Sequence, residues 1–429
     1  MLRAFSYRNY RLFFVGQILS LIGSWISMTA TSWLVYRLTG SALMLGVVGF
    51  AGQLPGFALG PFAGAYLDRW NRHRVLVTTQ AISMVQSFAL AVLTLTGHIT
   101  VEAIIILNAI QGFVNAFDMP ARQTFLVAMI TDKEDLANAI AMNSSMFNAA
   151  RLVGPSIAGI IIAASGEGMC FLIDGVSYLA VLVALLSMKN LHQPRTRRDL
   201  SVRAQFMEGW RYVFGFRPIR SLIMLLSFIC LVGVPFSVLM PVFATDVLRG
   251  GPNTLGLLMT AVGSGALAGA LWLASRRSVV GLGRIIMIST VIFSSGLVLF
   301  SFSRVLWMSL VALAITGWGM MVTMASSNTV IQTIVDEEKR GRVMSFYTMA
   351  FLGTAPFGSL FAGSLSARFG APHTVLLSGL LCFGAAIWFS QELPAIRRVV
   401  RPIYIRMGIL PEVATGLQTA SNLMVPPEE

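Results

Sequence analysis

The sequence has few charged residues and lacks the motifs of covalent chemistry. Asp, Glu, Lys and Arg make up 11% of its 429 residues, against about 25% in ordinary soluble domains, which argues against a water-soluble fold. Its three cysteines, Cys170, Cys230 and Cys382, lie singly in apolar segments, which excludes a disulfide framework and a cysteine zinc site. It contains no nucleophile motif, metal cluster or phosphate-binding loop. An enzyme, a metal site and an ATP-driven pump are therefore excluded, and no cofactor is expected.

Long apolar runs are what the sequence has in abundance. Hydrophobic residues make up 56% of the chain, and the runs between charges, glycines and prolines are long enough to cross a hydrocarbon layer of about 30 Å. We expect an all-α polytopic membrane protein with twelve transmembrane helices. They are predicted near 12–36, 42–67, 75–96, 101–121, 136–163, 169–188, 220–245, 254–275, 283–302, 305–333, 341–367 and 372–391.

The basic residues fall in alternate connections between these helices. The net charge of +13 would suggest nucleic acid in a soluble protein, but with the N-terminus inside, 26 of the 31 Lys and Arg residues lie on the cytoplasmic side. This follows the positive-inside rule. We therefore expect a multi-pass protein of the cell inner (plasma) membrane with both termini cytoplasmic. Its surroundings are membrane lipids, and nucleic acid is excluded as a partner.

The longest charged connection divides the chain into related halves. We predict an N-terminal six-helix bundle (1–188), a cytoplasmic linker (189–219), a C-terminal six-helix bundle (220–391) and a cytoplasmic tail (392–429). An amphipathic surface helix is expected at 204–216, and the first part of the tail is expected along the membrane surface. A shift of 204 residues aligns Gly154 with Gly358 and Gly166 with Gly370. Two repeats with a site between them are typical of a rocking transporter.

Four short stretches resemble a known family. Gly64 is followed by Asp68-Arg69 and a basic cluster that includes Arg72, and this segment resembles the cytoplasmic loop signature of the major facilitator superfamily. The stretch 115–123, Gly154-Pro155 with Gly159, and Arg340-Gly341-Arg342 strengthen the match. Together they are similar to the enterobactin-exporter and macrolide-efflux branch, which contains drug:proton antiporters. The resemblance implies the major facilitator fold, with two pseudo-symmetric bundles.

The resemblance also implies a cytoplasmic gate. Asp68 would cap the helix that begins near Gly341, where free N–H groups favour a carboxylate, and Arg72 would pair with Asp118. The alternative is that the arginines only fix the topology. The expected gate comprises Gly64, Asp68, Arg69, Arg72, Asp118, Arg122 and Gly341.

A polar stripe crosses the fourth predicted helix. Asn108, Gln111, Asn115, Asp118 and Arg122 follow one another at spacings of three or four and share one face. In hydrocarbon such groups need partners, so the stripe either lines a central cavity or joins this helix to its neighbours. Many drug exporters carry an arginine at the position that Asn108 occupies here, so the role of that arginine does not transfer to this chain.

Arg151 and Asp174 are the most costly residues in the apolar spans. Arg151 lies roughly 18 Å from the outer end of its helix, and a charge at that depth costs from about 2.5 to more than 10 kcal/mol. With Asn148 on the same face, it is expected to make an anionic-substrate contact or a coupling contact in the cavity; the alternative is a structural ion pair with Asp118 or another acid. Asp174 is expected either to carry a coupling proton or to face the outer solvent.

Two hinges are expected, because proline removes a backbone hydrogen bond. One comprises Gly154, Pro155 and Gly159, and the other comprises Pro356 and Gly358. The combined prediction is a monomeric secondary transporter that exports a small molecule, either a lipophilic drug or a siderophore-like metabolite, by proton antiport with alternating access. The alternatives are an uptake transporter of the same fold and a non-transporting membrane receptor or scaffold.

Overall fold

The computed structural model describes residues 3–67, 70–130, 132–188, 202–276 and 278–407. These residues form helices and connecting turns, with no strand among them. The first half comprises a short helix Arg3–Ser6, α1 (Arg8–Thr39), α2 (Ala42–Leu67), α3 (Arg72–Leu95), α4 (Val101–Ala128), α5 (Lys133–Ser165) and α6 (Glu167–Leu186).

The second half begins after α7 (Val202–Gly215), which covers most of the predicted amphipathic segment. Its first long helix is irregular: α8 (Arg217–Phe228) continues through π and 3₁₀ segments and α9 (Met240–Val242) to Val247. The remaining helices are α10 (Pro252–Ala274), α11 (Leu282–Phe302), α12 (Leu306–Ile334), α13 (Glu337–Leu352), α14 (Ala355–Phe369) and α15 (Ala371–Arg406).

The helix count agrees closely with the prediction, with three corrections to the bounds. The fourth helix does not end at 121 but continues through Pro120 to Ala128. Eleven helices of the described chain are long and apolar enough to cross a membrane. The single helix predicted at 341–367 is instead two, α13 and α14, because the chain breaks at Gly353 and Thr354, with Pro356 in the first turn of α14 where its missing N–H is tolerated. The last helix does not end at 391 but continues to Arg406, with Pro394 and Pro402 inside it.

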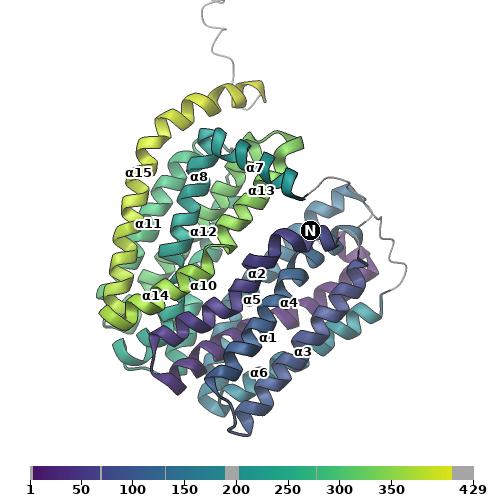
Figure 1. Ribbon diagram of the computed structural model, residues 1–429, viewed down its shortest axis with the longest axis vertical. Coiled ribbons are helices and arrows are strands. Elements are labelled where there is room, and N and C mark those ends of the chain that lie inside the picture. The colour runs from purple at the N-terminus through teal and green to yellow at the C-terminus, as the bar shows by residue number, and fades with distance from the viewer. Residues whose placement is uncertain (1–2, 68–69, 131, 189–201, 277, 408–429) are drawn as a thin grey trace, which may run out of the picture.

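The helices form two bundles that lie side by side (Figure 1). The N-terminus, α7 and the end of α15 lie at one end of the molecule, here called the linker end, and the opposite end is called the far end. Across the two halves, α2 packs on α14 and α5 packs on α10. The repeat is visible in the backbone, because Gly166 and Gly370 precede α6 and α15 with φ angles of 80° and 81°.

Candidate functional site between the two halves

Glycines bring the two halves into backbone contact in the far half of the molecule. A Cβ added to Gly46 of α2 would lie 2.6 Å from the carbonyl oxygen of Ser359 in α14. A Cβ added to Gly256 of α10 would lie 2.6 Å from the carbonyl oxygen of Pro155 in α5. Small residues of this kind allow helices to approach closely in a membrane. The far end is therefore closed by direct helix packing.

Hydrogen bonds between the halves reinforce this contact. Each joins a side chain of the first half to a side chain of the second half, and all lie in the same far part of the interface. They join Gln53 Nε2 to Ser359 Oγ (3.2 Å), Ser156 Oγ to Thr260 Oγ1 (2.6 Å) and the Tyr36 hydroxyl to Asp246 Oδ2 (2.5 Å).

The halves part toward the linker end. Gly46, Gln53 and Gly60 lie seven residues apart on one face of α2. Whereas Gly46 and Gln53 touch α14, a Cβ added to Gly60 or to Gly341 of α13 would meet no atom of another described segment within 4 Å. Figure 1 shows α2 and α13 diverging in this direction. The described conformation is thus closed at the far end and open at the linker end.

Arg151 lies where the two halves begin to part. Its backbone carbonyl is 3.2 Å from the position of a Cβ on Gly263 of α10. Its guanidinium carbon lies 6.0 Å from the centre of the Trp25 ring in α1, which is within reach of a cation–π interaction. The Phe147 ring meets Trp25 edge-on with centroids 6.0 Å apart. A cation and two aromatic rings therefore gather at the interface.

No described carboxylate lies within 4.0 Å of the Arg151 guanidinium. The alternative expectation, an ion pair with Asp118 or another acid, is therefore wrong for the described residues. Asn148, one turn earlier, donates from Nδ2 to the carbonyl oxygen of Ser144 in its own helix at 2.9 Å.

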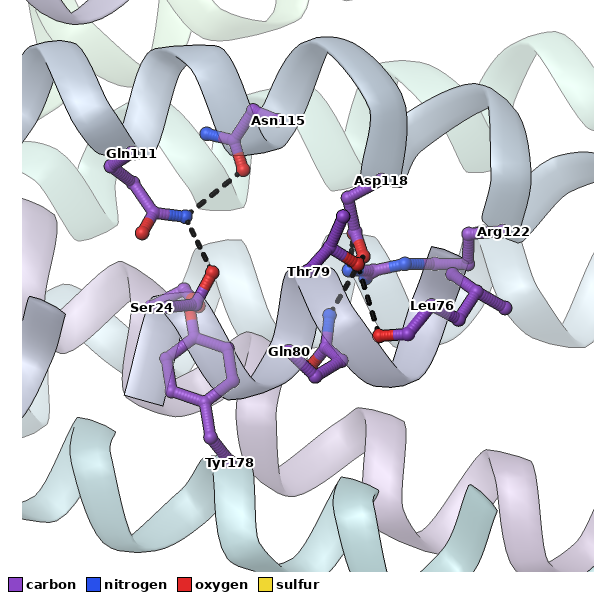
Figure 2. Close-up of polar contacts among 10 residues, drawn as sticks. Ser24, Leu76, Thr79, Gln80, Gln111, Asn115, Asp118, Arg122 and Tyr178 are labelled. Carbon is purple, nitrogen blue, oxygen red and sulfur yellow. Dashed lines mark hydrogen bonds and ion pairs between the residues drawn. The ribbon is translucent and has the colours of Figure 1, made fainter. Parts of the chain in front are cut away.

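Asp118 is held inside the first half by α3 and by its own helix. It is 3% exposed and accepts hydrogen bonds from Thr79 Oγ1 and Gln80 Nε2, both at 2.8 Å. Figure 2 shows this cluster, in which Arg122 forms the ion pair with Asp118. The ion pair was expected with Arg72; Arg122 takes that place because it lies one turn away on the same helix face.

The polar stripe of α4 divides between two environments. Gln111 Nε2 donates to Ser83 Oγ of α3 at 3.1 Å. It also donates to Asn115 Oδ1 at 3.1 Å (Figure 2). Asn108 Nδ2 donates to the carbonyl oxygen of Ile104 at 2.9 Å. Gln111, like Asp118, therefore joins α4 to α3, whereas Asn115 is exposed.

Asp174 is buried in the first half and does not face outer solvent, so that alternative is wrong. Asp174 is 3% exposed, and its Oδ2 accepts a hydrogen bond from Ser87 Oγ at 2.8 Å. Its other oxygen, Oδ1, has no hydrogen-bond partner among the described residues. It lies close to Gly23 of α1, whose added Cβ would be 3.0 Å away.

The expected gate is only partly within the described structure. Asp68 and Arg69 lie outside the described residues, so the expected cap on the helix near Gly341 is not addressed. Gly64 lies in the last turns of α2, Arg72 begins α3, and Gly341 is exposed near the start of α13.

The expected hinge glycines are close-packing positions. A Cβ on Gly154 would lie 2.5 Å from Trp25 Cβ, and one on Gly159 would lie 2.9 Å from the Pro252 carbonyl oxygen. One on Gly358 would lie 2.5 Å from the Leu231 carbonyl oxygen. Helix α5 remains helical through Pro155.

Two features were missed in the sequence. One is the buried polar face of α3, formed by Thr79, Gln80, Ser83, Gln86 and Ser87, whose helical spacing within an apolar span was a readable signal. The other is the Tyr36–Asp246 bond, which joins residues 210 positions apart and has no local signal.

Comparison with known proteins identifies relatives along nearly the whole chain. A family model described as transmembrane secretion effector matches residues 2–407. The staphyloferrin A transporter of Staphylococcus aureus is 27% identical over 392 residues, covering 89% of this chain and 96% of that protein. The multidrug efflux pump Tap of Mycolicibacterium fortuitum is 28% identical, with 89% and 95% covered. Macrolide efflux protein A of Streptococcus pyogenes is 24% identical, with 89% and 96% covered.

Solved structures share the fold. A bacterial homologue of the human lysosomal transporter Spinster, in an inward-facing and occupied conformation, superposes with a TM-score of 0.68 at 15% identity, covering 93% of this chain and 98% of that one. The nucleoside transporter NupG superposes with a TM-score of 0.67 at 14% identity, covering 89% and 98%.

Proposed function

The chain belongs to the transmembrane secretion effector family of the major facilitator superfamily, which makes it a multi-pass membrane transporter of small molecules and not an enzyme, and we propose that it exports its substrate in exchange for protons. The observation that carries the proposal is the asymmetric interface. The halves touch through Gly46 and Gly256 at the far end and part near Gly60. A pair of bundles that rock about a site between them gives alternating access.

We place the linker end on the cytoplasmic side of the cell inner membrane. The support is the distribution of Lys and Arg, most of which lie in connections at that end, as the positive-inside rule requires. In this orientation the described conformation accepts substrate from the cytoplasm. The working unit is proposed to be a monomer surrounded by membrane lipids, because one chain supplies both halves of the interface.

The substrate proposed is a lipophilic drug or a siderophore-like metabolite. The named relatives support both classes, since they include drug efflux pumps and a staphyloferrin A transporter. Arg151 beside Trp25 and Phe147 suits a molecule that combines a negative group with an apolar surface. Because no described acid neutralises Arg151, a substrate carboxylate is its natural partner.

The coupling ion proposed is the proton, and Asp174 is proposed as its carrier. A buried carboxylate in a membrane span is costly when charged, and such residues mark proton relays in transporters. The sequence contains no phosphate-binding loop, so an ion gradient supplies the energy.

Everted membrane vesicles test the proposal. An imposed gradient, acidic inside, should drive accumulation of a labelled macrolide or of staphyloferrin A, and adding either substrate should release protons from the vesicle. Accumulation driven in the opposite direction would favour the uptake transporter. A folded protein that moves neither substrate would favour the receptor or scaffold.

A further inference from the structure

A ladder of hydroxyl groups runs along the inner face of α3. Thr79, Ser83 and Ser87 are spaced four residues apart, so they lie one above another along the helix at intervals of roughly 6 Å, slightly more than one turn. Their exposed fractions are 6%, 2% and 1%. Polar groups at this depth cost free energy unless they find partners inside the protein.

Each end of the ladder is bonded to a buried carboxylate. Thr79 Oγ1 donates to Asp118 at 2.8 Å, and Ser87 Oγ donates to Asp174 at 2.8 Å. The middle hydroxyl, Ser83, accepts a hydrogen bond from Gln111 at 3.1 Å. Thus α3 connects a carboxylate of α4 near the linker end with a carboxylate of α6 nearer the far end (Figure 2 shows the Asp118 end).

Unpaired acceptors lie beside the ladder. Gln80 Oε1, Gln111 Oε1 and Asp174 Oδ1 are buried and have no hydrogen-bond partner among the described residues. Buried polar atoms in proteins are nearly always satisfied, frequently by ordered water. The Gln111 side chain contacts Ser83 and the Gln80 side chain contacts Asp118, so a water molecule beside the ladder would find an acceptor near each of these positions.

Among the described residues of the second half, α11 and α12 form no equivalent path. Asp174 corresponds through the 204-residue repeat to Ser378, which is also buried. The side-chain hydrogen bonds between α11 and α12 join hydroxyl groups, such as Ser289 with Thr323 at 2.8 Å, and neither helix contains Asp or Glu. The pair of carboxylates joined by a ladder is therefore a property of the first half.

We propose that the coupling proton crosses the interior of the first half along this ladder, on a route separate from the substrate route between the halves. The inference rests on the proposed proton coupling. Asp174 takes up a proton and passes it to a hydroxyl, which releases its own proton to the next acceptor, so one proton moves and no group is consumed. Asp118 receives the proton and hands it to the linker-end solvent.

The charged and titratable side chains along the route fit this direction. They are Asp174, Tyr178, Asp118 and Arg122. Tyr178 is buried and lies 3.2 Å from Ser24 Oγ, hydroxyl to hydroxyl (Figure 2). Arg122, the ion-pair partner of Asp118, has a side chain that is 22% exposed. Of the two carboxylates, Asp118 is therefore the one whose ion-pair partner reaches solvent.

The variant Ser83→Ala tests the route, because Ser83 contacts Gln111 and lies away from the Arg151 cluster. In reconstituted vesicles we expect substrate-driven proton movement to fall by about tenfold or more. Counterflow of labelled macrolide or staphyloferrin A, whichever the wild-type protein moves, needs no net proton transfer and should be unchanged. Ser83→Thr, which keeps a hydroxyl, should restore proton movement. The matched control is Ser294→Ala in α11, a buried serine bonded to its own helix, which should change neither measurement.

Three results would overturn the inference in different ways. Full proton movement in Ser83→Ala shows that the ladder is not the route. Loss of counterflow together with proton movement shows that Ser83 has a structural role only. A wild-type protein that performs counterflow without moving protons contradicts the proposed coupling itself, and with it the route, while leaving transport intact.

Discussion

Arg151 is a cation without a described acid partner at the point where the halves part. We expect Arg151→Ala to reduce transport of an anionic substrate by about tenfold or more, since one charge-assisted contact is lost. The melting temperature should not fall, because a buried unpaired charge costs at least about 2.5 kcal/mol in a membrane span. Transport in everted vesicles and thermal unfolding in detergent measure the two effects.

Arg151→Lys separates charge from geometry. It keeps the charge but loses the planar group over Trp25, so partial activity is expected. A lower melting temperature in Arg151→Ala, with transport reduced in proportion to folded protein, would make Arg151 a structural residue and contradict the substrate contact.

Single residues were easier to find than to orient. Arg151, Asp174 and Gln111 stand out in the sequence because polar groups are expensive in apolar spans. The direction in which each side chain points depends on the packing of other helices, so sequence reasoning left Asp174 between two alternatives. For Asp118 the family resemblance implies an ion pair with Arg72, whereas the structure pairs it with Arg122, four residues further along the same helix.

Helix packing within the first half depends on Gly112. A Cβ on this residue of α4 would collide with the carbonyl oxygen of Gly52 in α2. We expect Gly112→Ala to lower the free energy of unfolding by about 1–3 kcal/mol, the usual cost of overpacking. Gly60→Ala is the matched control, since its Cβ meets open space. Thermal unfolding of the two variants in the same detergent should differ; equal melting temperatures would contradict the close α2–α4 approach.

Whole elements were largely predictable from the sequence. Most of the apolar helices, such as α2 and α12, begin and end within a few residues of their expected bounds, because a long apolar run usually forms one membrane-crossing helix. The exceptions are α13 and α14, where Gly353 and Pro356 break a run of suitable length, and two helices that run on through proline. Helix α4 was expected to end at 121 but continues through Pro120 to Ala128, and α15 continues through Pro394 and Pro402. Apolar composition does not reveal where a helix breaks or continues beyond the hydrocarbon.

Closure of the linker end can be tested at Gly60. This residue shares a face with Gly46 and Gln53 but meets open space in the described conformation. Gly60→Leu should therefore fold with an unchanged melting temperature, yet prevent the halves from meeting there. We expect transport to be abolished, and a cysteine placed at Gly341 to react with maleimide equally fast with and without substrate. Normal transport by Gly60→Leu would show that this face never closes.

One of the contacts that hold the opposite end closed is the hydrogen bond between Tyr36 and Asp246, which joins the two halves at 2.5 Å. Hydrogen bonds to charged groups contribute about 1.5–3 kcal/mol, and about 1.4 kcal/mol changes an equilibrium tenfold. Tyr36→Phe should therefore raise the population open at the far end by about tenfold. Spin labels at Leu38 and Leu257, both exposed and in different halves, report the change as a longer distance component.

Tyr7→Phe is the matched control for this measurement. Its hydroxyl donates to Asp135 Oδ2 at 3.2 Å, so it removes the same kind of hydrogen bond, but both residues belong to the first half. The spin-label distances should stay unchanged in this variant, because a bond within one bundle does not distinguish the two arrangements of the halves. A shift of equal size in both variants would mean that general loosening, and not release of a bond between halves, opens the far end.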